Sequence, residues 1–211
     1  MKYKLKIIYD RLYEYFGPQH WWPGDTPFEV AVGAILTQNT NWGNVEKAIN
    51  NLKKEGKLNA GSLHNIPVNK LAALIRPAGY FNIKTKRLKH FIDFLVREYS
   101  GSMKEMKKED LQTIRKKLLS VNGIGPETAD SIILYALEKP VFVIDAYTKR
   151  VLSRHDMIDH DSSYDMFQEY FHSNLKKDIK LFNEYHALFV RLAKENCRTK
   201  PLCKSCPLEG I

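Results

Sequence analysis

The stretch that decides the fold runs from residue 121 to residue 154 and reads VNGIGPETADSIILYALEKPVFVIDAYTKRVLSR. Apolar residues recur at helical spacing on both sides of Asn122–Gly125, which predicts two amphipathic helices joined by a tight hairpin. Gly123 and Gly125 would let the backbone turn and approach a flat or charged partner closely. Pro126 suits the first turn of the second helix, where outward-pointing amide groups would favour an anion.

Two further features accompany the hairpin. Asp145 lies 20 residues beyond Gly125, at the start of the next helical pattern. Taken alone, the glycines are compatible with an ordinary helix–helix turn, and the aspartate with an N-cap. The three cysteines, Cys197, Cys203 and Cys206, have the spacing C-x5-C-x2-C. All three lie near the end of the chain, which suits a metal site in a reducing compartment better than a disulfide framework.

Together, the hairpin, the aspartate and the cysteines resemble the helix-hairpin-helix DNA glycosylase superfamily, in particular its endonuclease III-like branch. The hairpin of that branch reads roughly L-P-G-V-G, and its V-D-T-H-V-x-R-like segment matches VIDAYTKR at 143–150. The resemblance implies an all-α, two-lobed helix-hairpin-helix fold with a C-terminal Cys-rich, iron-sulfur-type loop. We expect a helical domain with the DNA-binding hairpin over 25–135. A second helical lobe, formed by 1–24 plus 136–211, would carry the catalytic aspartate and the Cys cluster.

Composition agrees with a folded, DNA-binding protein. Of 211 residues, 44% are hydrophobic and 11% aromatic, so the chain can bury a substantial core. The formal net charge of +9 favours a polyanionic partner, although a basic surface without a partner would show the same charge. No apolar run reaches the roughly 18 residues that a membrane span needs. We expect a cytoplasmic, nucleoid-associated monomer. It would bind double-stranded DNA that contains a damaged base, and it would not bind a membrane.

Local patterns predict helices along the remaining chain, including one over 2–16 and one capped by Thr26 or Asp25. The Lys- and Glu-rich start of 102–120 predicts a solvated linker that leads into the first hairpin helix. The short apolar run 141–144 has no partner run, so it does not predict a strand.

Two more segments resemble parts of the branch that contact DNA. The sequence LTQNTNW at 36–42 matches an L-S-x-Q-x-T-like turn, in which a glutamine fills the gap left by an extruded nucleotide. The sequence GYFNIK at 79–84 matches a G-L-Y-N-x-K-A-like segment, whose residue after the glycine wedges into the opposite strand. The sequence itself leaves open whether that residue, Tyr80, is buried or inserted. The DNA-binding residues implied by the resemblance are Gln38, Asn39, Thr40, Tyr80, Gly123, Ile124, Gly125 and Thr128.

Tryptophans suggest the substrate. Adjacent Trp21 and Trp22 could cap the core or form a flat wall for a stacked base. With Pro23 and with Trp42, shortly after the Gln-Asn-Thr turn, they look like the base pocket of the 3-methyladenine glycosylases of this branch. An alkylated purine such as 3-methyladenine carries positive charge, which an indole face attracts by about 0.5 to 2 kcal/mol per contact.

The chemistry implied by the resemblance is cleavage of the bond between base and deoxyribose. Positive charge builds on the sugar as this bond breaks, and a fixed carboxylate at Asp145 would oppose it and orient the attacking water. Bifunctional members carry a nucleophilic lysine where this chain has Glu127, and glutamate cannot form the Schiff base of the lyase step. We therefore expect a monofunctional glycosylase. The alternatives are an endonuclease III-like pyrimidine or mismatch glycosylase and a non-catalytic DNA-binding homologue.

The resemblance also implies a [4Fe-4S] cluster on Cys197, Cys203 and Cys206 that orders a basic loop. Family members space their ligands as C-x6-C-x2-C-x5-C, so the first interval here is one residue shorter, and a fourth cysteine would fall just past Ile211. The spacing by itself also allows a zinc site or an empty, reduced tail.

Overall fold

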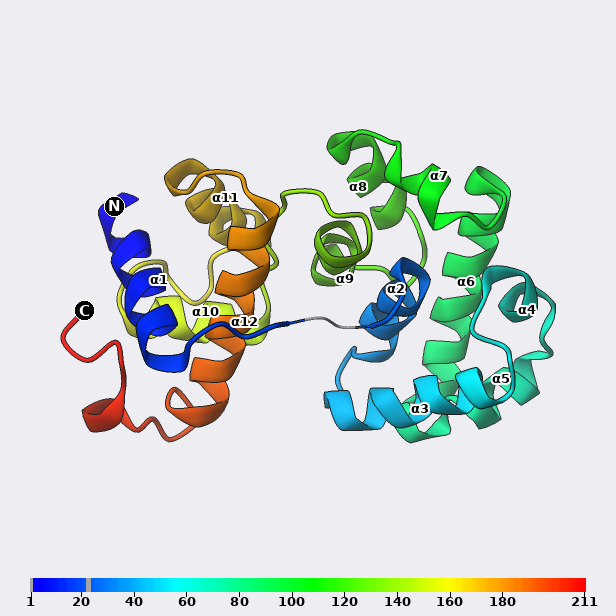
Figure 1. Ribbon diagram of the computed structural model, residues 1–211, viewed down its shortest axis with the longest axis horizontal. Coiled ribbons are helices and arrows are strands. Elements are labelled where there is room, and N and C mark those ends of the chain that lie inside the picture. Colours follow the sequence, from blue (N-terminus) through cyan, green and yellow to red (C-terminus); the bar gives the residue numbers. More distant parts are fainter. Residues whose placement is uncertain (1, 22–23) are drawn as a thin grey trace. The chain divides into compact units, whose positions relative to one another are not determined.

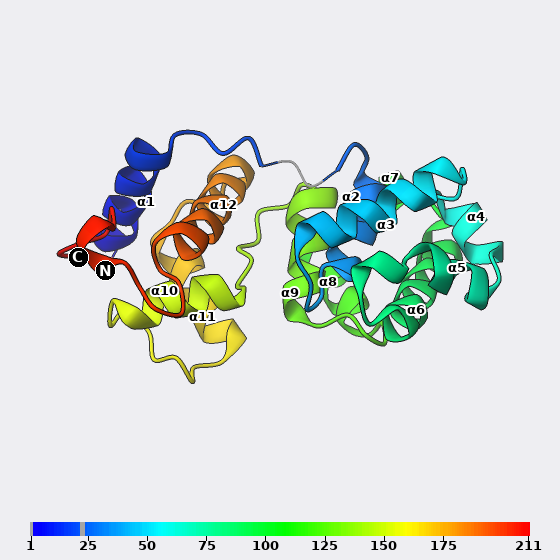
Figure 2. The same cartoon turned by 90° about the horizontal axis from the view of Figure 1, so that it is seen from below.

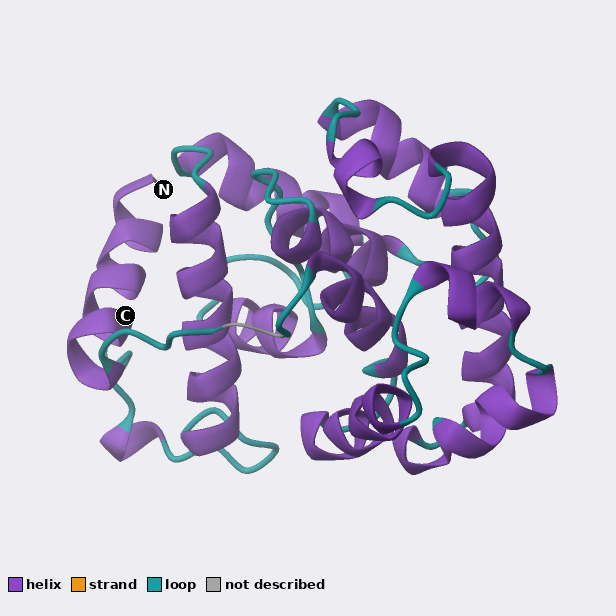
Figure 3. Ribbon diagram, turned by 45° about the vertical axis from the view of Figure 1, so that its right-hand side comes forward, coloured by secondary structure: helices purple, strands orange, loops and turns teal. Residues whose placement is uncertain are grey.

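The computed structural model describes residues 2–21 and 24–211. Within these residues every regular element is a helix and no strand occurs (Figure 3), so the all-α prediction is confirmed. The chain divides into two compact units, one formed by Met1–Trp21 and Pro140–Ile211 and the other by Trp22–Lys139. None of the described helices has the length and apolar character that a membrane crossing requires.

The unit Trp22–Lys139 is built on helix α2 (Figure 1). The sequence of this helix, PFEVAVGAIL, is apolar on nearly all sides. Such a helix has to be buried, and α2 contacts α3, α6, α9 and the turn η2. The helices of this unit are α2 (Pro27–Leu36), α3 (Trp42–Lys54), α4 (Ala60–Asn65), α5 (Val68–Leu74), α6 (Phe81–Tyr99), α7 (Met103–Lys107), α8 (Leu111–Leu119) and α9 (Pro126–Ser131), with a 3-10 turn η1 (Arg76–Ala78) and a π-helical turn η2 (Ile132–Ala136).

The start of α2 agrees with the sequence, whereas the predicted linker does not. Thr26 caps α2, because its hydroxyl accepts a hydrogen bond from the Glu29 amide at 3.1 Å.

The prediction of a solvated linker over 102–120 is wrong at its beginning, where α7 forms. Met103 and Met106 lie three residues apart on one face of α7, and both are buried. Two apolar side chains are thus enough to dock this short helix, which contacts α6.

The two hairpin helices are joined by a buried ion pair. Arg115 of α8 donates to both carboxylate oxygens of Asp130 in α9, at 2.8 and 3.2 Å, and the Asp130 side chain is fully buried. The sequence predicts one regular helix after the hairpin, but α9 gives way to η2, where the Leu137 amide donates to the Ile132 carbonyl at 3.0 Å. The wider π turn accommodates the unbroken apolar run 132–137, all of which is buried.

The other unit is organised around an aromatic core. The rings of Phe142 and Phe171 stack with centroids 3.7 Å apart, and Tyr185 packs on Phe189 at 4.8 Å. The Tyr185 hydroxyl donates to the Leu5 carbonyl at 2.8 Å and ties α12 to α1. Helices α10 and α12 lie side by side in both views (Figures 1 and 2). The helices of this unit are α1 (Lys2–Phe16), α10 (Ala146–Arg154), α11 (Tyr164–Asn174) and α12 (Ile179–Glu195), with a 3-10 turn η3 (Cys203–Ser205).

An extended segment, 140–145, leads into α10 without pairing with a strand. Side chains of α11 take the place of a partner strand. His172 accepts a hydrogen bond from the Phe142 amide at 3.0 Å, and Gln168 donates to the Phe142 carbonyl at 2.8 Å. The Tyr164 hydroxyl accepts from the Ile144 amide at 3.2 Å. These side chains therefore satisfy backbone groups that burial would otherwise leave without partners.

Candidate functional site

The two hairpin glycines differ in what the fold requires of them. Gly123 has φ +90°, and a Cβ placed there would lie 2.2 Å from Cγ of Arg87, so no other residue fits without displacing the arginine. Gly125 has an ordinary extended backbone, with φ −89° and ψ 178°, and a Cβ there would meet nothing within 4 Å. Between them, Ile124 turns its side chain into the core, with only 4% exposed.

Gln38 and Thr128, both predicted to bind DNA, meet at this hairpin. The Gln38 side-chain amide nitrogen donates to the Gly123 carbonyl at 3.0 Å and to the Thr128 hydroxyl at 2.9 Å. Its oxygen accepts a hydrogen bond from Arg87. Arg87 therefore contacts the Gln38 turn through its guanidinium and the hairpin through its stem.

A buried lysine fixes the turns that carry the other predicted DNA contacts. Lys84 of α6 is 1% exposed, and its ammonium group donates to the carbonyls of Leu36 at 2.8 Å and Ala78 at 2.7 Å. These carbonyls end α2 and η1, directly before the Gln38 turn and the Tyr80 turn. Burial, with a smaller contribution from the charge of Arg87, lowers the pKa of Lys84 to about 8.

Residues at the tips of these two turns project outward. Tyr80 has φ +45° and is 69% exposed, so the alternative that its ring is buried in the core is excluded. Asn39 has φ +53° and is also exposed, whereas Thr40 is half-buried and its amide donates to the Thr37 carbonyl at 3.0 Å. The exposed tyrosine and asparagine both adopt the left-handed conformation, which is uncommon for residues other than glycine.

The predicted base-pocket residues are divided between the units. Trp42 begins α3 and is 37% exposed; its ring packs on α2 at Gly33, where a Cβ would lie 3.3 Å from the indole Cη2. Trp21 belongs to the other unit, and its indole N–H is buried without a hydrogen-bond partner in the described part of the chain. Trp22 and Pro23 lie outside the described residues.

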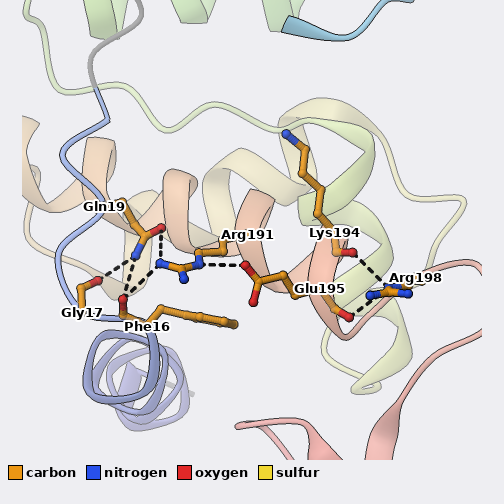
Figure 4. Close-up of polar contacts among 7 residues, drawn as sticks. All are labelled: Phe16, Gly17, Gln19, Arg191, Lys194, Glu195 and Arg198. Carbon is orange, nitrogen blue, oxygen red and sulfur yellow. Dashed lines mark hydrogen bonds and ion pairs between the residues drawn. The ribbon is translucent and has the colours of Figure 1, made fainter. Parts of the chain in front are cut away.

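The segment that leads to Trp21 is held on α12 (Figure 4). Arg191 donates to the Phe16 carbonyl at 3.1 Å and to the Gln19 side-chain oxygen at 3.3 Å, and its guanidinium lies 4.9 Å from the centre of the Phe16 ring. Two turns earlier on α12, Glu184 accepts a hydrogen bond from the Gln19 amide at 2.7 Å. Helix α12 thus determines the path of the chain just before this tryptophan.

Asp145 occupies the N-cap of α10. One carboxylate oxygen accepts a hydrogen bond from the Thr148 amide at 2.7 Å, and the other lies 3.4 Å from Nε2 of His186 on α12. The carboxylate is 13% exposed. Burial raises the pKa of Asp145, but the attraction of His186 and the Thr148 hydrogen bond outweigh it, so the pKa lies below its usual value. The capping role and a fixed, ionised carboxylate therefore occur together.

The cysteine loop is held by two arginines of α10. Arg150 donates to the Cys197 carbonyl at 2.8 Å, and Arg154 donates to the carbonyls of Arg198 at 2.5 Å and Thr199 at 3.1 Å. Arg154 also lies 3.4 Å from the Cys197 sulfur.

The three cysteine side chains differ in their exposure. Cys197 is buried, Cys203 is exposed and Cys206 lies between these extremes, with its thiol pKa raised by burial. Among residues 2–21 and 24–211, no three His, Cys, Asp or Glu side chains converge to hold a metal ion. The [4Fe-4S] cluster therefore stays a prediction.

Three residues at these sites were not identified from the sequence. Lys84 had a visible signal, because it falls four residues before Leu88 and seven before Phe91 on the apolar face of α6, where a lysine has to be buried with partners. Arg87 and His186 gave no such signal. Their roles depend on neighbours that are distant in the sequence, namely Gln38 and Asp145.

Comparison with known proteins identifies the family. Residues 32–177 match the HhH-GPD superfamily of base excision DNA repair proteins. The chain belongs to this superfamily. A Methanocaldococcus jannaschii protein, MJ1434, assigned by name to the DNA repair glycosylases, is 52% identical over 204 residues, which are 96% of this chain and 92% of that protein. The resemblance expected from the hairpin, Asp145 and the cysteines is thereby confirmed.

Solved structures of the superfamily have the same fold. Helicobacter pylori 3-methyladenine DNA glycosylase bound to 1,N6-ethenoadenine matches with a TM-score of 0.77 and 29% identity, over 92% of this chain and 97% of that chain. A trapped endonuclease III–DNA covalent intermediate matches with a TM-score of 0.84 and 21% identity, over 99% of this chain and 93% of that chain. At 21% identity, the second match supports the fold alone.

The different surroundings of the two hairpin glycines give a matched pair of variants. We expect Gly123→Ala to lower the free energy of unfolding by about 2 kcal/mol, because it combines a left-handed backbone with a clash against Arg87. Gly125→Ala should cost about 1 kcal/mol or less, because alanine is a poorer N-cap than glycine for α9 but would meet no atom within 4 Å. Urea unfolding followed by circular dichroism measures both values. Equal losses for the two variants would contradict this account of the hairpin.

Proposed function

We propose that this DNA glycosylase of base excision repair releases an alkylated purine, such as 3-methyladenine, from double-stranded DNA and leaves the sugar-phosphate backbone intact. The observation that carries the proposal is the state of Asp145. Its carboxylate is fixed at the N-terminus of α10, and its pKa lies below the usual value. It is therefore a permanent negative charge at neutral pH, held in a defined direction.

Such a carboxylate suits the cleavage of a glycosidic bond. As the base departs, positive charge develops on the deoxyribose, and a fixed negative group lowers the free energy of that transition state. The same group can orient the water that attacks C1′. A 3-alkylated purine already carries positive charge, so it departs without a strong general acid. One aspartate, Asp145, is then sufficient for the chemistry, and we assign no step to the cysteine loop.

We assign DNA binding to the unit Trp22–Lys139. Family membership and the net charge of +9 support this assignment. In the proposal, the hairpin residues Gly123–Gly125, together with Thr128, hold the damaged strand, and the Gln38–Thr40 turn fills the space left by the extruded nucleotide. Tyr80, exposed on a turn that Lys84 fixes, enters the opposite strand. The unit with Asp145 supplies the chemistry.

The choice of an alkylated purine rests on tryptophan. The exposed part of Trp42 offers an indole face to the base. Electron-rich faces attract a cationic purine more than a neutral one. The Helicobacter pylori relative, 29% identical, is a 3-methyladenine DNA glycosylase that binds 1,N6-ethenoadenine, also a modified purine. Trp21, Trp22 and Pro23 are the other residues that we assign to base binding.

Identification of the free base released from defined duplexes tests the function directly. We expect 3-methyladenine to be released from methylated DNA, and Asp145→Asn to lower the single-turnover rate by at least about 100-fold while retaining duplex binding. Chromatography of the released bases measures the activity, and gel shift measures binding. Release of thymine or oxidised pyrimidines in place of methylated purines would favour an endonuclease III-like specificity. Binding without release of any base would identify a non-catalytic homologue.

Trp42 allows the basis of substrate choice to be tested. Trp42→Ala should slow release of 3-methyladenine by about 5- to 30-fold, because the loss of one contact between the indole and the cationic base removes about 1 to 2 kcal/mol. Trp42→Phe keeps an aromatic face and should lose less. The comparison uses single-turnover rates on the same methylated duplex. A Trp42→Ala protein that is as fast as its parent would exclude the pocket proposed here.

The absence of lyase chemistry can be tested by trapping. Glu127 stands where bifunctional members carry the nucleophilic lysine, and a carboxylate forms no Schiff base. Incubation with lesion-containing or abasic DNA and sodium borohydride should therefore yield no covalent protein–DNA complex on denaturing gels. A bifunctional glycosylase treated in parallel provides the positive control. A stable trapped species would show that another amine of this chain acts as a nucleophile.

A further inference from the structure

Asp145 is restrained from two directions by different elements. The Thr148 amide, in the first turn of α10, holds one oxygen at 2.7 Å. A single hydrogen bond of this kind is what any capping aspartate makes, and it restrains the carboxylate through one oxygen only. That second oxygen lies 3.4 Å from Nε2 of His186, which comes from α12.

His186 is buried on a helix that is anchored in the core. Its side chain is 8% exposed, and its neighbour Tyr185 is fixed by a hydrogen bond to the Leu5 carbonyl and by the ring of Phe189. One turn further along α12, Arg191 anchors the segment that leads to Trp21. The imidazole therefore belongs to a helix whose position is determined by the core, and not to a mobile loop.

We infer that His186 is a positioning residue for the glycosylase reaction, which fixes the direction of the second carboxylate oxygen of Asp145. This inference rests on the proposed function of Asp145. With one oxygen bound to the helix N-terminus and the other beside the imidazole, the carboxylate has one orientation before DNA binds. A group already aligned in this way loses no further freedom in the transition state.

The local electrostatics support the same role. A carboxylate that is 13% exposed would bind a proton more readily than one in water, because burial disfavours its charged form. The attraction of His186 helps to reverse this tendency and contributes to the lowered pKa of Asp145. His186 thus acts on the reaction through Asp145, without contacting the DNA itself.

A merely structural role, in which His186 only joins α10 to α12, predicts a different outcome. In that case any substitution would lower stability and activity together, and a substitution of the adjacent Tyr185 would do the same. A positioning role requires a selective loss of the chemical step. Glutamine distinguishes the two, because its side-chain nitrogen can reach the position of Nε2, whereas the ring of phenylalanine fills the space without a donor.

The experiment compares His186→Phe, His186→Gln, Tyr185→Phe and Asp145→Asn in the full chain. The readouts are the single-turnover release of 3-methyladenine from methylated duplex DNA, the affinity for a duplex with a tetrahydrofuran abasic analogue, and the midpoint of thermal unfolding. We expect His186→Phe to slow release on the order of 10- to 100-fold with an affinity within about 2-fold of the parent. His186→Gln should recover most of the rate. Tyr185→Phe should lower the unfolding midpoint and leave the rate unchanged.

The outcomes separate this inference from the proposed function. If Asp145→Asn abolishes release but His186→Phe is as fast as the parent, His186 has no positioning role and Asp145 keeps its own. If Asp145→Asn retains release, both proposals are wrong. A rate loss in His186→Gln as large as that in His186→Phe also overturns the inference. If the His186→Phe protein does not fold, His186→Asn takes its place in the comparison. The asparagine side chain is too short for its amide to reach the Asp145 carboxylate.

Discussion

Hydrogen bonds from side chains to the backbone of loops are the interactions on which the candidate sites depend. Lys84 donates to the ends of α2 and η1, Gln38 donates to the hairpin, and Gln168 donates to the segment before Asp145. Leaving a buried carbonyl without a partner costs about 1 to 3 kcal/mol. The loops are therefore ordered by the same contacts that make their burial possible.

Much of the fold follows from local sequence patterns. The hairpin between two apolar stripes, the Thr26 cap, the positive φ of Gly123 and the capping geometry of Asp145 all depend on residues close together in the chain. Such features are legible without a structure, because the physical cause lies within a few residues. The same holds for the first turn of α9, which Pro126 begins.

Features that depend on distant partners were missed or misread. The α7 segment reads as solvated because its charged residues outnumber its two methionines, yet the methionines decide its burial. The π turn η2 does not interrupt the apolar pattern, so nothing local announces it. His186 is one histidine among seven until α12 places it beside a carboxylate 41 residues earlier in the chain. The sequence predicts a capping role for Asp145, but it does not predict that the second carboxylate oxygen lies beside His186.

In the proposed function, the hydrogen bonds of the Gln38 side-chain amide affect how a lesion is found. Its nitrogen and its oxygen both have hydrogen-bond partners within the protein, so in the proposed function its entry into a duplex would require these hydrogen bonds to be exchanged for new ones. In an intact base pair the hydrogen-bonding groups are already paired. Each Gln38 hydrogen bond that is lost without replacement would cost about 1 kcal/mol. Under the proposed function, sound DNA is scanned with the glutamine withdrawn. Gln38 would enter the duplex where a weakened base pair has already opened. Damage would therefore be recognised first by the low stability of the base pair.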